Sequence, residues 1–331
     1  MPPSKRIPGG VIDLRFRVAD GDGAPLASLA GLTVALATSG PTSDLGGASP
    51  PLVRATLVGN GATGTVTGPD AEGNYAYASS VTLPADASGS WRIGLEMRRA
   101  VTLSNGETVN EAAQNPVEVF SVDGSLLEDR RTVVAQENCA NCHGTFSVDF
   151  GIHGNLRNRV EYCVICHNAN VTDFGRRRNA VGVGGDPVNE TIAFKHVIHK
   201  IHRGEDLMHA PYVIYGFGAP PASFTPHDFA EVLFPGDLRN CDTCHVGDSQ
   251  LLPLPAGLLP TLESVVDISS GTAVEVATGA IPVVQDACLA CHDSDDAAAH
   301  AETMTTPSGA EACNVCHEEG SLVAVSEVHA R

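Results

Sequence analysis

The chain of 331 residues has few aromatic side chains, 5% of the total with a single Trp, and only four Met. No apolar run approaches the roughly 18 residues that a membrane-crossing helix needs, and Met1-Pro2-Pro3-Ser4-Lys5-Arg6 contains no hydrophobic signal core. We therefore expect no membrane span, and no export signal within the given sequence. Basic residues number 20 against 39 acidic ones, a net charge of −19 that repels phosphate backbones and excludes nucleic acid as a partner.

All ten cysteines fall into five copies of one pattern, Cys-x-x-Cys-His. The copies are Cys139-Ala-Asn-Cys142-His143, Cys163-Val-Ile-Cys166-His167, Cys241-Asp-Thr-Cys244-His245, Cys288-Leu-Ala-Cys291-His292 and Cys313-Asn-Val-Cys316-His317. This pattern is typical of haem c attachment. The two thiols bond to the vinyl groups of one porphyrin, and the following imidazole ligates its iron. The sequence therefore predicts five covalently bound haem c groups.

Three other interpretations account for the cysteines less well. A disulfide framework leaves the five following histidines unexplained, and a Cys-x-x-Cys loop is too short to constrain much chain. Zinc ribbons pair their Cys-x-x-Cys motifs, whereas five is an odd number. Thioredoxin-like redox pairs occur singly and near a βαβ pattern, which is missing here.

Haem c attachment also predicts a compartment, because the haem is joined to the chain beyond the cytoplasmic membrane. We therefore expect an exported protein whose precursor carries a signal ahead of Met1. Its expected location is the cell surface, the outer membrane or the extracellular medium, with the periplasm as the alternative.

The sequence divides into a predicted β domain, residues 1–132, and a predicted pentahaem domain, residues 133–331. The first part has no Cys or His, and apolar and polar residues alternate in 12–18 and 91–98. Shorter strands are expected at 32–36, 52–58, 75–83 and 117–122. Short antiparallel strands of this kind favour a β sandwich or a Greek-key split barrel. We expect docking, spacing or haem-shielding roles for this domain.

The second part leaves about 38 residues for each porphyrin, too few for a conventional core. Short helices and loops are therefore expected to wrap the haems, which lie close to one another. Eight histidines outside the motifs can supply sixth ligands: His153, His196, His199, His202, His209, His227, His300 and His329. Because Met is scarce, bis-histidine ligation and low-spin irons are predicted.

One segment, 189–204, is predicted to form a helix with Asn189 as its N-cap and Gly204 just beyond its C-terminus. His199 and His202 lie three residues apart in it, on neighbouring positions of one face. We expect this helix to ligate two adjacent irons.

The order of these features resembles the OmcA/MtrC family of outer-membrane multihaem cytochromes. The resemblance covers essentially the whole chain and rests on the motifs together with several flanking segments. These segments are His153-Gly154, Glu161-Tyr162, Ile198-His199-Lys200-Ile201-His202, Phe234-Pro235-Gly236-Asp237, Ala298-Ala299-His300-Ala301 and Val328-His329. In that family a β domain precedes a pentahaem domain, and the pair usually occurs twice, so this chain is similar to one half of a decahaem member.

The resemblance implies five distal ligands, His153, His199, His202, His300 and His329. His196, His209 and His227 are then left with surface or hydrogen-bonding roles. It also implies electron transfer through a porin-cytochrome complex to metal oxides, soluble metals or flavins.

The leading functional prediction is an electron relay through five bis-histidine haems, without catalysis of its own. A multihaem reductase with one open iron site is the first alternative. A homo-oligomer or filament, joined by the β domain, is the second. The acidic surface favours basic patches on a redox protein donor or acceptor.

Overall fold

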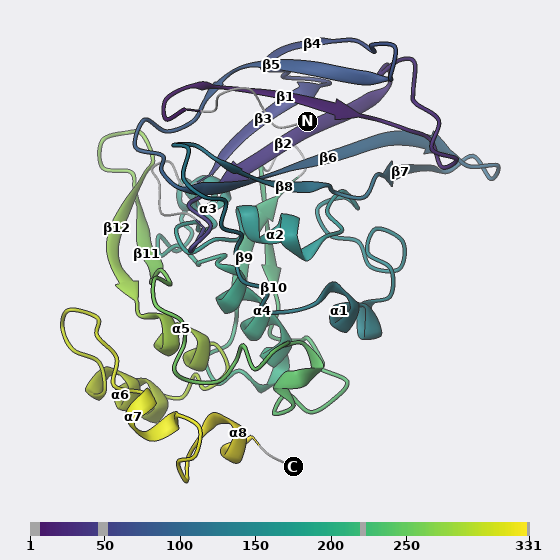
Figure 1. The fold of residues 1–331 in the computed structure, drawn as a ribbon. Helices are drawn as coiled ribbons and strands as arrows, with labels where there is room; N and C mark the ends of the chain where they lie inside the picture. The colour runs from purple at the N-terminus through teal and green to yellow at the C-terminus, as the bar shows by residue number, and fades with distance from the viewer. Residues whose placement is uncertain (1–6, 46–51, 219–222, 330–331) are drawn as a thin grey trace. The chain divides into compact units, whose positions relative to one another are not determined.

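The computed structural model describes residues 7–45, 52–218 and 223–329 (Figure 1). Residues 1–6, in which the sequence analysis found no export signal, lie outside the described residues. The chain separates into two compact units. The first comprises Met1–Arg131 and Ala135–Cys166, and the second Thr132–Val134 and His167–Arg331. The predicted domains are defined by where haem is attached, and the two compact units do not test that. The boundary at 132/133 therefore stays a prediction.

The first unit contains two antiparallel sheets, drawn as two layers in Figure 1. The larger sheet has the order β3 (Val53–Val58), β2 (Leu32–Ser39), β6 (Ser90–Thr102) and β7 (Thr108–Ala112), with β8 (Val117–Ser121) also paired to β6. The smaller sheet has the order β1 (Val11–Arg17), β5 (Asn74–Thr82) and β4 (Gly64–Thr67). All six strands expected from the sequence are present. The two additional strands, β4 and β7, are short and largely exposed, so neither shows an apolar alternation.

The core of this unit is formed by alternate residues of both sheets. Ile12 and Tyr77 come from the smaller sheet, and Leu36 and Trp91 from the larger; all four are at most 2% exposed. Since successive side chains of a strand point to opposite faces, the period-two pattern buries one face of each sheet against the other. The predicted antiparallel β sandwich is confirmed.

Two short helices complete the first unit, α1 (Gln136–His143) and α2 (Val160–Cys166). Helix α2 packs on the larger sheet, where Tyr162 and Ile165 form a buried cluster with Ala37 of β2. Gly94 of β6 makes this approach possible, because a Cβ at that position would lie 2.4 Å from Cδ2 of Tyr162. The sandwich therefore supports the helix that carries Cys163 and Cys166.

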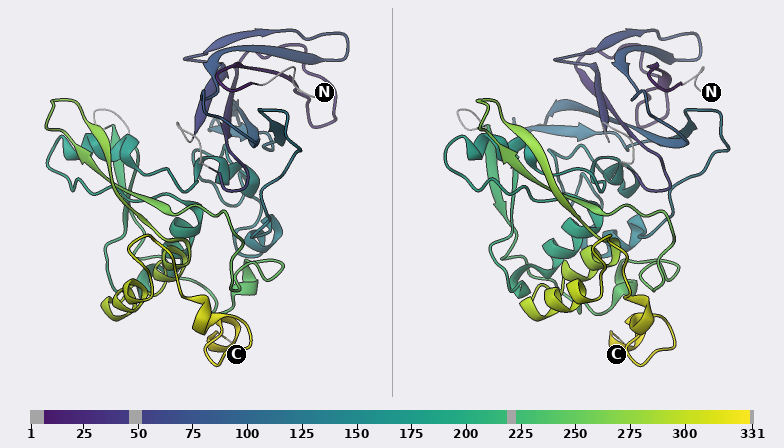
Figure 2. Two further views of the ribbon diagram at one scale, coloured as in Figure 1. Left: turned by 60° about the vertical axis from the view of Figure 1, so that its left-hand side comes forward. Right: turned by 90° about the vertical axis from the view of Figure 1, so that its left-hand side faces the viewer.

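The second unit, teal to yellow in Figure 2, consists mainly of short helices and loops, as expected. Its helices are α3 (Phe174–Val181), α4 (Phe194–Arg203), η1 (Gly204–Asp206), η2 (Cys241–Thr243), α5 (Val283–Leu289), α6 (Asp295–Thr303), α7 (Asn314–His317) and α8 (Val325–Val328). It also contains two hairpins that the sequence analysis did not predict, β9 (Val213–Phe217) with β10 (Phe224–Asp228) and β11 (Thr261–Asp267) with β12 (Val274–Ile281). Strand β12 is exposed along almost its whole length, which explains why it shows no buried face in the sequence.

Helix α4 is shorter than predicted. It begins at Phe194, because Asn189 pairs with β11 instead of capping the helix. The backbone N–H of Asn189 donates to the carbonyl of Ser264 at 3.0 Å, and its side-chain amide donates to Oγ of Ser264 at 2.9 Å. The predicted C-terminus is confirmed, since Gly204 follows the last helical residue with a φ of 43°. Within the described residues, no helix combines the length and the apolar character needed to span a membrane.

Candidate haem-binding sites

The five thiol pairs lie on or beside short helical segments, and none of the ten cysteines forms a disulfide. Helices α1 and α2 carry the first and second pairs, η2 begins at Cys241 of the third, and α5 contains Cys288 of the fourth. The fifth pair starts at Cys313, the N-cap of α7. In a helical turn, residues three apart lie on the same side, so both thiols of a pair can face one porphyrin edge.

The environment of the thiols disfavours the redox and zinc interpretations. Burial raises the pKa of Cys163 to about 12 and that of Cys291 to about 11. A redox-active Cys-x-x-Cys pair instead requires a lowered thiol pKa. Within residues 7–45, 52–218 and 223–329, no three His, Cys, Asp or Glu side chains converge as a zinc site would require.

Three pairs of imidazole rings lie close together in the second unit, and each pair joins a motif histidine to a histidine outside the motifs. The rings of one pair, His199 and His245, are stacked, and those of the other two pairs meet edge to face. The ring-centre distances are 6.1 Å for His199 and His245, 5.9 Å for His292 and His329, and 6.3 Å for His300 and His317. With a metal–nitrogen bond of about 2.0 Å, two axial imidazoles on one metal have ring centres about 6.3 Å apart. The donor set and its spacing thus fit a haem iron in three places.

Several of the imidazoles predicted to ligate iron, inside and outside the three pairs, are oriented by a hydrogen bond at Nδ1. This bond leaves Nε2 for a metal. Four Nδ1–H groups donate to backbone carbonyls. His167 donates to Ile192 (2.8 Å), His202 to Ile198 (2.8 Å), His317 to Val323 (2.8 Å) and His329 to Val325 (2.9 Å). Nδ1 of His245 lies 3.0 Å from Oγ of Ser249, whose hydroxyl donates to the carbonyl of Val133. A carbonyl only accepts, so the proton sits on Nδ1 and the tautomer is the one that ligates through Nε2.

The remaining predicted ligands are less completely placed. His153 lies in a turn with a φ of 51°, and the ring of His143 packs against Phe150 at 4.2 Å. His202 lies on α4 one turn beyond His199 and contacts Phe234 at a ring-centre distance of 5.7 Å. The roles of His153 and His202 as distal ligands stay predictions, as do those of His199, His300 and His329.

The three histidines expected to have other roles lie in different environments. His209 is largely exposed, and its Nε2 lies 3.2 Å from a carboxylate oxygen of Asp295. His227 stacks beside Phe229 at 6.4 Å. His196 is buried and hydrogen-bonded to Asp286. The sequence analysis did not identify Asp286 as its partner.

The thiols also show which motifs are neighbours. Cys241 lies near enough to Cys291, and Cys313 near enough to Cys288, to help raise the pKa of these thiols, although burial is the main cause. The third motif is therefore a neighbour of the fourth, and the fourth of the fifth. In the first unit, Cys139 and Cys163 interact in the same way.

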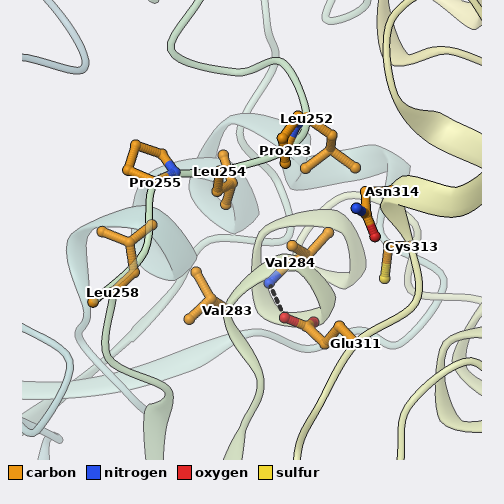
Figure 3. A pocket seen from close by; sticks show the side chains of 11 residues that line it. Leu252, Pro253, Leu254, Pro255, Leu258, Val283, Val284, Glu311, Cys313 and Asn314 are labelled. Carbon is orange, nitrogen blue, oxygen red and sulfur yellow. Dashed lines mark hydrogen bonds between the residues drawn. The ribbon is translucent and has the colours of Figure 1, made fainter.

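A pocket of about 250 Å³ adjoins the fifth motif, and leucine, proline and valine side chains line much of it (Figure 3). Leu252, Val284 and Cys313 are among the residues that line it. The carboxylate of Glu311 accepts hydrogen bonds from the backbone N–H groups of Val284 (3.0 Å) and Gln285 (2.6 Å), which joins the segment before Cys313 to the start of α5. Such a wall suits the apolar faces of a porphyrin bound to Cys313.

Comparison with known families decides the relationship. A sequence model described as outer membrane cytochrome MtrC/MtrF-like, domains II/IV, matches residues 131–330. The chain belongs to this family. The crystal structure of MtrC from Shewanella baltica OS185 is 20% identical to the chain, with a TM-score of 0.47, over 98% of this chain and 43% of that one. The chain thus spans less than half the length of that protein. No curated protein matches it.

The family match confirms the resemblance to OmcA/MtrC cytochromes. MtrC/MtrF-like proteins are outer-membrane, multihaem c-type cytochromes of electron transport. Haem c is therefore the cofactor of this chain.

Proposed function

We propose that the chain carries five haem c groups and relays single electrons between redox partners in extracellular electron transfer. The observation that carries this proposal is the pairing of three motif histidines with three others at about 6 Å. Each pair supplies both axial ligands of one iron. A saturated iron exchanges electrons without binding a substrate, which favours a relay over a reductase.

The chain's own residues would hold and tune the cofactors. The ten cysteines would form the thioether bonds, and the five motif histidines the proximal ligands. His153, His199, His202, His300 and His329 would be the distal ligands. Haem c supplies the one-electron Fe(III)/Fe(II) couple when bound. Carbonyl and hydroxyl acceptors at Nδ1 would keep five of the imidazoles basic, which favours the oxidised iron and lowers its potential. These are His167, His202, His245, His317 and His329.

The proximity of thiols supports a continuous path through the second unit. The third, fourth and fifth motifs are linked in series by the pairs Cys241–Cys291 and Cys288–Cys313. Helix α4 extends this series, because His199 and His202 are three residues apart on it. Electrons would therefore pass between porphyrins whose attachment points are adjacent.

The partners follow from the charge and the family. A net charge of −19 favours basic patches on a donor or acceptor protein, or cationic and mineral acceptors. We propose a porin-cytochrome complex as the electron donor, and metal oxides, soluble metals or flavins as acceptors, at the cell surface. A homo-oligomer or filament stays an alternative, to be checked by electron microscopy.

Two measurements on the exported, mature protein test this proposal. Intact mass spectrometry is expected to show five added porphyrins; a smaller number would overturn the haem count. Low-temperature EPR of the oxidised protein is expected to show only low-spin ferric signals. A stoichiometric high-spin signal would instead favour the reductase.

The variant His199→Ala tests the ligand assignment. We expect one haem of the five to become high-spin, because His245 then has no imidazole opposite it. The matched control is His209→Ala, which removes an exposed histidine and leaves the EPR spectrum unchanged. An unchanged spectrum in His199→Ala would remove His199 from the ligand set.

A further inference from the structure

A buried histidine outside the proposed ligand set lies next to one of the paired sites. His196 is 9% exposed and precedes the proposed ligand His199 by three residues on α4. Its Nδ1 lies 2.6 Å from Oδ1 of Asp286. Its Nε2 is buried without a hydrogen-bond partner among the described residues. A buried imidazole with one unsatisfied nitrogen is a costly arrangement that calls for a function.

The partner carboxylate is completely enclosed. Asp286 is 1% exposed, accepts a hydrogen bond from Oγ1 of Thr261 at 2.5 Å, and lies 3.7 Å from Nζ of Lys195. Burial favours the neutral acid, but the hydrogen bonds from His196 and Thr261 and the charge of Lys195 outweigh it and lower the pKa of Asp286. Asp286 is therefore a buried negative charge held beside the imidazole of His196.

The other groups around His196 come from its own helix and from the elements packed against it. Lys195 and the proposed ligand His199 lie on the same helix, α4. The facing groups from other elements are Asp286 on α5 and Thr261 on β11. The ring centre of Tyr212 lies 6.3 Å from that of His196. Nζ of Lys200 lies 4.6 Å from the Tyr212 ring centre, and the charges of Glu190, Asp173 and Asp286 reach Tyr212. Burial raises the pKa of Tyr212, so it stays neutral. His196 is thus an imidazole outside the proposed ligand set that lies between a buried carboxylate and a proposed ligand of the same helix.

We propose that His196 takes up a proton from the solvent when the iron held by His199 and His245 is reduced. This inference rests on the proposed function. One electron from the redox partner converts Fe(III) to Fe(II) and removes one positive charge. One proton from water forms the Nε2–H bond of His196 and restores that charge, so electron and proton balance. No bond to carbon or sulfur forms or breaks.

The physical link is the electrostatic coupling between the two sites. Both His196 and Asp286 lie close enough for a charge on either to act on His199. Loss of a positive charge at the neighbouring iron is expected to raise the proton affinity of His196 about tenfold. By linkage, the same coupling makes the electron affinity of that iron depend on pH.

The experiment measures haem potentials against pH in the haem-loaded full chain, using an electrode as the electron source. For one haem component of the wild type, we expect the midpoint potential to fall as pH rises. The fall approaches 59 mV for each tenfold change in proton activity when one proton accompanies one electron. In His196→Gln this component is expected to lose its pH dependence. His209→Gln, the exposed control, is expected to behave like the wild type.

A second readout counts protons directly. Full reduction in unbuffered solution with a pH indicator is expected to consume up to one proton fewer per molecule in His196→Gln than in the wild type. Lys195→Gln keeps His196 but removes a positive charge near Asp286, so the pH-dependent range is expected to move to higher pH. This variant keeps the proposal testable if His196→Gln does not fold.

Each outcome has a distinct meaning. A pH dependence that persists in His196→Gln assigns the proton to haem propionates and overturns the proposal, as does a wild type without pH dependence. A high-spin signal in His196→Gln would make His196 an axial ligand and would overturn it as well. A wild-type chain without attached porphyrins would instead refute the proposed function.

Discussion

Replacing Gly94 with alanine tests how α2, the helix that carries Cys163 and Cys166, is seated on β6. A Cβ at this position would lie 2.4 Å from Cδ2 of Tyr162 and 3.2 Å from Cδ1 of Ile165. Tyr162 is 1% exposed, and its hydroxyl donates to Oε2 of Glu96 at 3.1 Å. The ring therefore cannot move away without breaking this hydrogen bond or displacing the helix.

The expected magnitude follows from two opposing effects. Overpacking of a close-packed site costs about 1–3 kcal/mol. Removing the extra backbone freedom of a glycine in a strand returns about 0.5–1 kcal/mol. We expect Gly94→Ala to lower the free energy of unfolding by about 0.5–2 kcal/mol, which for a unit of this size lowers Tm by roughly 1–8 °C.

The assay is urea and thermal unfolding of the haem-loaded protein, followed by far-UV circular dichroism. Gly21→Ala is the matched control in the same unit, because a Cβ there meets nothing within 4 Å. In a Tyr162→Leu background, Gly94→Ala is expected to cost less, since the clashing ring is gone. If Gly94→Ala is as stable as the Gly21→Ala control, the close approach of α2 to β6 is not a constraint and the reasoning is wrong.

Three further predictions concern charges and ligands. Glu96→Gln breaks the buried 2.8 Å pair with Arg157 and is expected to cost about 3–5 kcal/mol in urea unfolding, against at most about 1 kcal/mol for the exposed Glu111→Gln. Burial favours the neutral form of Glu96, but the hydrogen bond and charge of Arg157 outweigh it and lower its pKa. The stability that ionised Glu96 contributes is therefore complete above its unfolded-state pKa of about 4.3 and is lost as the pH falls through its lowered folded-state pKa. Urea unfolding curves at decreasing pH measure this loss. His300→Ala is expected to turn one haem high-spin in EPR, whereas the control His227→Ala leaves all signals low-spin.

The local features of this protein were predictable from the sequence. The five motifs need only a spacing of three residues between thiols, and the strands of the sandwich show a period of two. The helix at 194–203 and its end at Gly204 follow from local periodicity and backbone freedom in the same way. Asn189 was wrongly expected to cap this helix, because its true partner, Ser264, is 75 residues away in sequence.

The sequence by itself determined the thiol pairs predicted to bond haem, the number of histidines that can serve as second ligands, and the β character of the first part, because each depends on neighbouring residues along the chain. Only the tertiary structure decided which imidazoles face each other, such as His199 and His245, and that His196 meets Asp286. It also decided that Gly94 leaves room for Tyr162. These contacts join segments distant in sequence, and their partners are chosen by packing and by backbone carbonyls, which every residue possesses and no residue type reveals.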